Sequence, residues 1–464
     1  MRRPNPILAL LAVLACVVSS QPSSFEIPGF EPSGGSRERQ IKWPNKTIQI
    51  ALSTSLMSPS AAVKPDSDVA GAVRRALNSW ADVADITFVE VSSKAQSISP
   101  TSGGDGINLI TIAPTAENLD IFGEGNNTAR TRVFYDPENG EISEADIVIN
   151  PFPYSAEGLP IQFSTDGTAD TYDLESTFAH EIGHLLGLSH SSVIGATMQA
   201  SQGLNGTYGL PAFTERTLSE PDLAAVRSLY GAREKLGSLG SIEGRILNSI
   251  DGALLPAIGA HVWIEDLASG RVIASSLTNP SGRFSINGVP SGRYRAMAKY
   301  GEGVDESTAL TSAGGAGPRA RARAFRSVEI KSRLRVAADK ATTLNYVLVP
   351  PQNSPPALNP RFIGINGELS TVPVPAKAGT KFTLYVGGDG VDQVPGSGLI
   401  ISSPFITVDP ASLMLQHFNS STPVISFEVT VAANAPPGDY SIRLQSNSGE
   451  IAYLVGGIKT SPRF

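Results

Sequence analysis

The spacing of hydrophobic residues divides the chain at about residue 231. Before this point, segments with helical spacing alternate with segments in which every second residue is apolar. The helical spacing predicts helices over residues 68–83, 173–186 and 220–230. The strand-like alternation predicts strands over residues 47–52, 86–91, 108–112 and 145–150. This mixture predicts an α+β domain at residues 41–235, with a twisted mixed sheet and three helices.

After residue 231 the helical spacing all but disappears. Short alternating runs are separated by turn sequences, among them Asn279-Pro-Ser-Gly and Pro436-Pro-Gly-Asp. A stiff Pro-rich linker at residues 351–360 separates two such regions. We therefore expect a multidomain chain in which two all-β sandwich domains, at residues 240–350 and 361–464, follow the α+β domain.

Residues 1–20 have the composition of a signal peptide. Arg2 and Arg3 precede an apolar run, Ile7 to Val18, that is too short for a membrane-spanning helix. Cys16 lies in this run and leaves two alternatives open: cleavage after Ser20, or cleavage before Cys16 with a lipid on its thiol. Either alternative predicts an exported protein, secreted or lipid-anchored at the cell surface. Residues 21–40 are polar and rich in Pro and Gly, which predicts a flexible linker.

Composition narrows the classes of function. The 464 residues are enough for about three domains of roughly 150 residues each. A net charge of −7 at pH 7 gives no electrostatic footprint for nucleic acid, so we expect no nucleic-acid partner. The single cysteine excludes an intrachain disulfide and every zinc site that needs two cysteines. Only five histidines occur, so their positions are informative.

Three of these histidines fall in one motif, His180-Glu-Ile-Gly-His-Leu-Leu-Gly-Leu-Ser-His190. On a helix, His180 and His184 lie one turn apart on the same face, so both imidazoles reach one metal ion. Gly187 lets the chain turn back sharply, so that His190 approaches the same ion from outside the helix. Three neutral imidazoles leave a fourth coordination position for water, as in catalytic zinc sites.

Glu181 lies beside the two helical histidines and completes the chemistry. A zinc ion would lower the pKa of its bound water toward about 7 and polarise the carbonyl of the scissile bond. Glu181 would accept the proton of that water during attack and deliver it to the leaving amine. The motif therefore predicts peptide-bond hydrolysis with one Zn²⁺ held by His180, His184 and His190, and with Glu181 as the general base.

The motif resembles the metzincin signature, and its surroundings resemble the matrixin branch of those proteases. Ser191 directly follows the third histidine, and Met198 stands where a Met-turn methionine is expected. Further matrixin-like segments are Lys42-Trp43-Pro44, Asn78-Ser-Trp80, Ala145-Asp-Ile147 and Leu218-Ser-Glu-Pro-Asp-Leu. The resemblance covers about residues 41–231 and implies a metzincin fold and the activity of a zinc metalloendopeptidase.

Some features of vertebrate matrixins are missing. Latency through a pro-domain cysteine on the zinc is not expected, because residues 21–40 are too few for a folded pro-domain and Cys16 lies in the signal segment. A second, His-rich zinc site is not expected, because His261 and His417 both lie in the β regions. Acidic loop residues are candidate calcium ligands, although such carboxylates are usually only solvated, and none is assigned. These candidates are Asp105, Asp166, Asp170 and Asp173.

The two β regions have weaker resemblances. Residues 240–350, above all Thr278 to Tyr294, are similar to the carboxypeptidase regulatory-like (transthyretin-like) fold, and residues 361–464 resemble a bacterial Ig-like domain in pattern. A fold of this kind says little about what it binds. The basic run Pro318 to Arg326 is interpreted as a solvated loop, with an anionic-surface contact or a proteolytic nicking site as alternatives.

Two hypotheses from different classes remain. The favoured one is an exported zinc endopeptidase that acts on a protein or peptide substrate. The alternative is a surface binding or adhesion protein with a vestigial metalloprotease domain, which the large β-rich part of the chain motivates. An intact Glu181 argues against this alternative. Membrane contact is expected only through a lipid on Cys16, and the β domains are candidates for binding the cell surface or the substrate. Cleavage specificity is not predicted, because residues 199–211 are too irregular.

Overall fold

The computed structural model describes most of the chain from residue 40 onward. The described ranges are 40–57, 61–123, 126–155, 158–210, 216–233, 239–250, 252–300, 326–348, 357–418 and 421–461. The expected signal peptide, Cys16, nearly all of the first linker, most of the basic run and the start of the Pro-rich linker lie outside them. Within these ranges the chain forms three units: an N-terminal unit (40–233), a middle β unit (239–348) and a C-terminal β unit (357–461).

The N-terminal unit is built on a five-stranded sheet with the order β2-β1-β3-β5-β4. Its strands are β1 (Thr47–Ser53), β2 (Thr87–Ser93), β3 (Leu109–Thr111), β4 (Ala129–Tyr135) and β5 (Ile142–Ile149). All neighbours pair in parallel except β4, which runs antiparallel to β5 at the edge of the sheet. A small second sheet pairs β6 (Phe163–Ser164) with β7 (Tyr172–Asp173).

The helices of this unit confirm the three that the spacing predicts, each within three residues of the expected ends. They are α1 (Val69–Ala81), α3 (Leu174–Leu185) and α4 (Glu220–Tyr230), and the short α2 (Ala116–Asp120) and the 3₁₀ turns Thr54–Met57 and Thr207–Gly209 are additional. Helices α1 and α3 bury their apolar faces, including Trp80 and Phe178, in one core with β1 and β5. Among the described residues, no helix is long and apolar enough to cross a membrane.

Strand β4 was not predicted, although it lies next to the predicted strand at residues 145–150. Its sequence places Arg130 and Arg132 between small or half-buried residues, and most of its side chains are only partly covered. An edge strand pairs with a neighbour on one side and is partly open to solvent, so it needs little alternation of apolar residues. The pattern of hydrophobic residues is therefore weak there.

Each β unit consists of two facing sheets around its own core. In the middle unit, one sheet has the order β11-β10-β13-β14, and the other contains β12, β8, β15, β16 and β9. These strands are β8 (Leu239–Ile250), β9 (Ala253–Pro256), β10 (His261–Asp266), β11 (Val272–Leu277), β12 (Arg283–Pro290), β13 (Gly292–Lys299), β14 (Val328–Val336), β15 (Ala341–Thr343) and β16 (Tyr346–Leu348).

The C-terminal β unit has sheets of the order β17-β19-β22-β21 and β18-β24-β23-β20. Its strands are β17 (Asn359–Gly364), β18 (Val374–Ala376), β19 (Lys381–Asp389), β20 (Leu399–Ile401), β21 (Ile406–Gln416), β22 (Val424–Val431), β23 (Gly438–Gln445) and β24 (Ile451–Thr460), with 3₁₀ turns at Val391–Gln393 and Gly396–Gly398. The chain is therefore a β-rich, multidomain protein with few helices.

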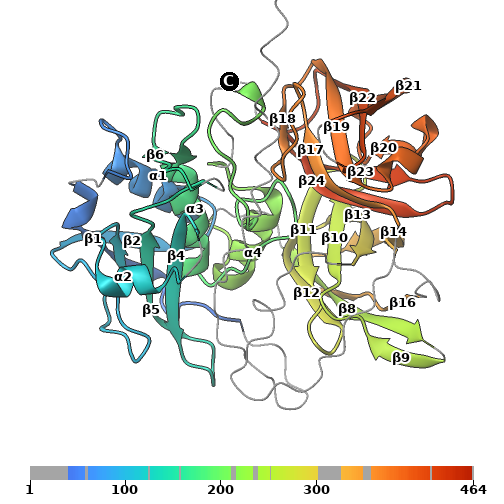
Figure 1. The fold of residues 1–464 in the computed structure, drawn as a ribbon. Helices are drawn as coiled ribbons and strands as arrows, with labels where there is room; N and C mark the ends of the chain where they lie inside the picture. Colours follow the sequence, from blue (N-terminus) through green and yellow to red (C-terminus); the bar gives the residue numbers. More distant parts are fainter. Residues whose placement is uncertain are drawn as a thin grey trace, which may run out of the picture.

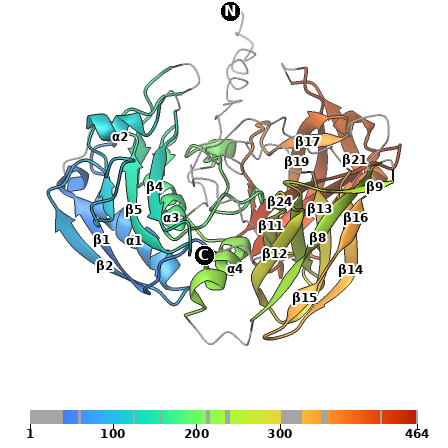
Figure 2. The ribbon, with the colours of Figure 1, turned by 90° about the horizontal axis from the view of Figure 1, so that it is seen from below.

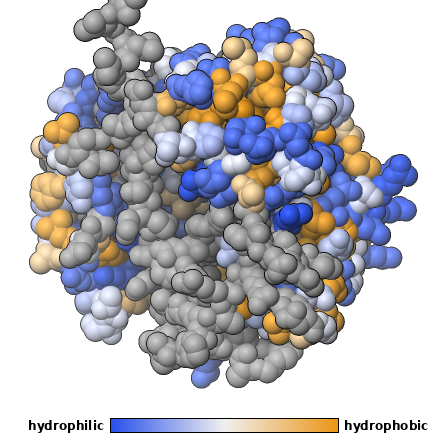
Figure 3. Space-filling view, turned by 45° about the vertical axis from the view of Figure 1, so that its right-hand side comes forward, coloured by the Kyte–Doolittle hydropathy of each residue, from blue (hydrophilic) through white to orange (hydrophobic). Residues whose placement is uncertain are grey.

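Helix α4 of the N-terminal unit packs against strands β11 and β12 of the middle unit (Figures 1 and 2). A buried cluster joins all three units, with Val193 and Ala196 from the first, Trp263 from the second, and Tyr453 and Val455 from the third. On the face shown in Figure 3, apolar residues gather near the top, and smaller apolar patches lie among hydrophilic residues elsewhere. The interfaces between units are thus parts of the protein core.

Candidate metal centre

Helix α3, which carries the first two motif histidines, is fixed at its start by a charged cap. The Asp173 carboxylate accepts the Ser176 N–H at 2.9 Å and is paired with the Arg216 guanidinium at 2.5 Å. Asp173 is thus the N-cap of the helix and satisfies a helix N–H that lacks an intrahelical partner. Along the helix, the Trp80 indole N–H donates to the Ala179 carbonyl at 2.8 Å. The helix is therefore anchored at its start and along its length.

The helix ends in the sharp turn that the sequence predicts at Gly187. Gly187 has φ +90°, its N–H bonds the His184 carbonyl, and the Leu188 N–H bonds the Gly183 carbonyl. This pair of bonds is the Schellman arrangement, in which a residue beyond the helix adopts left-handed φ. A Cβ at Gly187 would also overlap the Ile41 carbonyl oxygen. The left-handed φ and this close contact are two separate reasons for glycine at this position.

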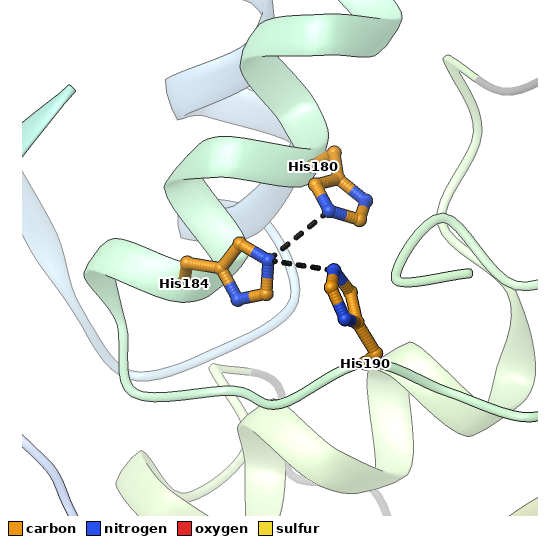
Figure 4. A group of neighbouring side chains, drawn as sticks. All are labelled: His180, His184 and His190. Carbon is orange, nitrogen blue, oxygen red and sulfur yellow. Dashed lines mark hydrogen bonds between the residues drawn. The ribbon is translucent and has the colours of Figure 1, made fainter. Parts of the chain in front are cut away.

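The turn brings the third histidine back to the first two (Figure 4). The Nε2 atoms of His180 and His190 lie 3.1 and 3.2 Å from Nε2 of His184. Two nitrogens bound to one tetrahedral zinc at about 2.0–2.1 Å would lie about 3.3 Å apart. Within the described residues, these three form the one group of His, Cys, Asp or Glu whose atoms converge in this way. The group could hold a metal ion.

The outward-facing ring nitrogens fix which atom faces the centre. Nδ1 of His180 lies 2.8 Å from the Thr197 carbonyl, and Nδ1 of His184 lies 2.8 Å from the Leu188 carbonyl. A carbonyl only accepts, so each Nδ1 carries the proton and each Nε2 presents a lone pair. Two lone pairs that face each other at 3.1 Å repel unless a cation lies between them. The donor set therefore fits zinc.

Burial favours the neutral imidazole of His184 and of His190. It lowers the pKa of His184 well below the usual value, with the charges of His180 and His190 acting in the same direction. Burial, with His180 second, lowers the pKa of His190 to about 3. A neutral imidazole is the form that binds a metal ion.

Glu181 lies on the same helix and is 5% exposed. Its Oε2 accepts the Thr131 hydroxyl of β4 at 2.5 Å, and Thr131 also contacts the Glu181 carbonyl. Burial raises the pKa of the Glu181 carboxyl, while His180, the Thr131 hydrogen bond and the Arg130 charge act to lower it. A buried carboxylate with one hydrogen bond to a neutral hydroxyl is a competent proton acceptor.

The segment after His190 forms a tight turn beneath the histidines. The Ser191 N–H bonds the Met198 carbonyl at 2.7 Å, and the Thr197 and Met198 N–H groups bond the Asp222 carboxylate at 2.8 and 3.2 Å. Met198 is 2% exposed and packs in the core with Trp80. The sequence correctly indicated Met198 in a turn here.

The four candidate calcium ligands do not form a cluster within the part of the chain that is described. Asp166 pairs with Lys64 at 2.5 Å, and Asp173 pairs with Arg216. Asp105 accepts the Ile107 N–H in its own loop, and Asp170 has a left-handed φ of +61°. Asp105, Asp166 and Asp173 thus hold local structure, and no calcium ligand is assigned.

Sequence reasoning did not find Thr131, Arg130, Thr197 or Asp222. The first two lie on the unpredicted edge strand, so nothing in the sequence placed them near the motif. Thr197 acts through its backbone carbonyl, which leaves no side-chain signature. Asp222 had a detectable signal, because Ser219 and Asp222 have the spacing of a capping box and form one at the start of α4.

Comparison with known proteins agrees with this geometry. Residues 127–231, which contain all three histidines and Glu181, match the Matrixin family. Metalloendoproteinase 1 of Glycine max is 28% identical over 41% of this chain and 53% of that protein. Metalloendoproteinase 4-MMP of Arabidopsis thaliana is 31% identical over 35% of this chain and 40% of that protein. The chain thus spans about half the length of these relatives, and the similarity lies in metalloprotease sequence.

Among solved structures, the minor pilin GBS52 of Streptococcus agalactiae is 14% identical and covers 26% of this chain and 50% of its own, with a TM-score of 0.16. A score this low assigns no fold, and the resemblances to transthyretin-like and Ig-like domains are not confirmed.

Proposed function

We propose that this protein is an exported, zinc-dependent endopeptidase. The observation that carries the proposal is the convergence of three imidazole Nε2 atoms beside a buried carboxylate, His180, His184 and His190 with Glu181. The match of residues 127–231 to the Matrixin family supports it. A zinc ion at this centre would supply a Lewis acid for water and for the substrate carbonyl.

The roles of the chain's own residues follow from their contacts. His180 and His184 would hold the metal with Nε2, because their Nδ1 protons are committed to the Thr197 and Leu188 carbonyls. Glu181 would accept a proton from the attacking water and return it to the leaving amine. Thr131 holds Oε2 of Glu181 and so leaves Oε1 for that transfer.

The test compares Glu181→Gln with Glu90→Gln. The second variant is a carboxylate-to-amide control on β2, at the edge of the sheet opposite β4. Casein hydrolysis and the zinc content of the purified full chain are measured for both. We expect Glu181→Gln to keep one zinc and to lose about 10²- to 10⁴-fold in rate, the usual share of general acid–base catalysis. The control should match the wild type in both measurements.

The outcomes separate the possible failures. Unchanged turnover in Glu181→Gln would contradict the base role, and hydrolysis that a chelator leaves intact would contradict the metal. Absence of both zinc and hydrolysis in the wild type would favour the alternative, a surface binding or adhesion protein with a vestigial metalloprotease domain. N-terminal mass spectrometry of the exported chain would distinguish cleavage after Ser20 from a lipid on Cys16.

A further inference from the structure

The turn that follows His190 is packed against the C-terminal β unit. In Figures 1 and 2 the green segment between α3 and α4 lies beside the strands of that unit. The Ile194 N–H donates to the Val455 carbonyl of β24 at 2.8 Å. Val193 packs in the buried cluster with Tyr453 and Val455. The turn beneath the histidines is therefore covered by a strand that lies far away in the sequence.

A buried lysine of β24 binds this turn directly. Lys459 is 5% exposed, and its ammonium donates to the Gly195 carbonyl at 2.9 Å and to the Thr217 carbonyl at 3.2 Å. Both acceptors belong to the N-terminal unit and are 22 residues apart in the sequence. A charge-assisted bond from a desolvated ammonium is stronger than one between neutral groups. Lys459 therefore links two loops of the N-terminal unit.

The hydrogen bonds continue from this lysine to a motif histidine. The Thr217 carbonyl that binds Lys459 also accepts the Thr197 hydroxyl at 3.2 Å. The Thr197 carbonyl in turn accepts Nδ1–H of His180 at 2.8 Å. Lys459 thus stands at one end of a chain of hydrogen bonds that runs through Thr217 and Thr197 to the His180 ring.

A carboxylate completes the environment of Lys459. Asp439, its cross-strand partner on β23, is fully buried, and a Cβ at Gly195 would overlap its Oδ1. Among the described residues, neither of its carboxylate oxygens has a hydrogen-bond partner. Burial raises the pKa of Asp439 to about 7, with Lys459 the main opposing influence. Removal of Lys459 would therefore leave Asp439 without a nearby ammonium.

A second contact fixes the far end of the same segment. Tyr208 is fully buried in the core of the C-terminal β unit, with φ +64°. Its hydroxyl lies 3.0 and 2.7 Å from the Ile363 and Val372 carbonyls, and its N–H donates to the Glu368 carboxylate at 2.7 Å. The segment from Val193 to Tyr208 is thus held at both ends by the C-terminal β unit.

We propose that Lys459 is a positioning residue for the metal centre and that the C-terminal β unit is part of that centre, through the turn at Gly195 to Thr197. This inference rests on the proposed function, because the centre is taken to bind zinc. It predicts that zinc affinity depends on a side chain with no contact to any histidine. The β unit is then a structural requirement of the metal site, in addition to any binding of its own.

The test measures zinc affinity of the full chain by competition with a chromophoric chelator. Lys459→Met should weaken zinc binding about 3- to 10-fold, less than the roughly 10- to 100-fold typical of a direct outer-shell partner. The matched control is Lys381→Met, which removes an exposed lysine of the same unit that pairs with Glu428. This control should leave zinc affinity unchanged.

A second variant separates positioning from loss of stability. Lys459→Met with Asp439→Asn removes both charges, so it should regain thermal stability but not zinc affinity. Recovery of affinity in this double variant, or wild-type affinity in Lys459→Met, would overturn the proposal. If neither variant folds, Thr197→Val removes the hydroxyl that shares the Thr217 carbonyl, and unchanged affinity there would overturn it equally. A wild type that binds no zinc would instead refute the proposed function.

Discussion

Gly183 lies between the two helical histidines, and its replacement by alanine tests how tightly the turn beneath them is packed. A Cβ at this position would overlap the Met198 Sδ and lie 3.0 Å from both the Met198 Cε and the Trp80 Cζ2. Ordinary carbon contacts begin at about 3.5 Å. Met198 is 2% exposed and Trp80 is fully buried, so a displaced side chain would have to repack within the protein core.

Two opposing effects decide the magnitude. In a helix interior, alanine is favoured over glycine by about 1 kcal/mol. Overpacking a well-filled core costs about 1–3 kcal/mol. We therefore expect Gly183→Ala to lower the free energy of unfolding by up to about 2 kcal/mol. It should also weaken zinc binding, because displaced Met198 is next to Thr197, whose carbonyl orients His180.

The assay is urea denaturation of the apoprotein, with zinc affinity measured in parallel. The same substitution in a Met198→Ala background is the control, because the overlap with sulfur is then absent. There Gly183→Ala should be neutral or stabilising by up to about 1 kcal/mol. A gain of about 1 kcal/mol in the wild-type background, as at an unhindered helix position, would refute the proposed packing.

Two further predictions concern the C-terminal β unit. Tyr208→Phe removes the donor shared by the Ile363 and Val372 carbonyls, and should lower the free energy of unfolding by about 1–3 kcal/mol in urea denaturation; no loss would mean that water replaces the hydroxyl. Asp439 has a pKa of about 7 in the folded state, above the usual 3.8, so the folded state binds the extra proton and stability falls as pH rises from about 4 to 7. Asp439→Asn should remove this slope and stabilise the protein at pH 8 but not at pH 4 in thermal unfolding, and equal slopes in the two proteins would contradict it.

The sequence sufficed for features that depend on local spacing. His180 and His184 are four residues apart on a strongly patterned helix, and Gly187 stands where a helix that must turn back needs left-handed φ. The capped ends of α3 and α4 are likewise encoded within a few residues of each end. Such contacts join residues that are close together in the sequence, so the local pattern of residue types determines them.

Features that depend on distant contacts could not be predicted. Thr131 reaches Glu181 from an edge strand with weak alternation. Tyr208 lies in a loop without a regular pattern of hydrophobic residues, and the contacts that hold it come from the core of the C-terminal β unit. Lys459 resembles any strand lysine, and only the register of β23 and β24 against the N-terminal unit buries it. Packing between units, rather than local propensity, places these side chains.

The contact between Lys459 and Gly195 joins residues 264 positions apart, and this has a consequence for the order of assembly. Units near the N-terminus generally fold first while a chain is being synthesised. Contacts between such distant residues form late and slowly. The histidine motif would therefore emerge well before β24, and the turn beneath it would stay incomplete until that strand docks. A nascent or truncated chain would therefore carry the full motif before the contact between Lys459 and the Gly195 carbonyl has formed.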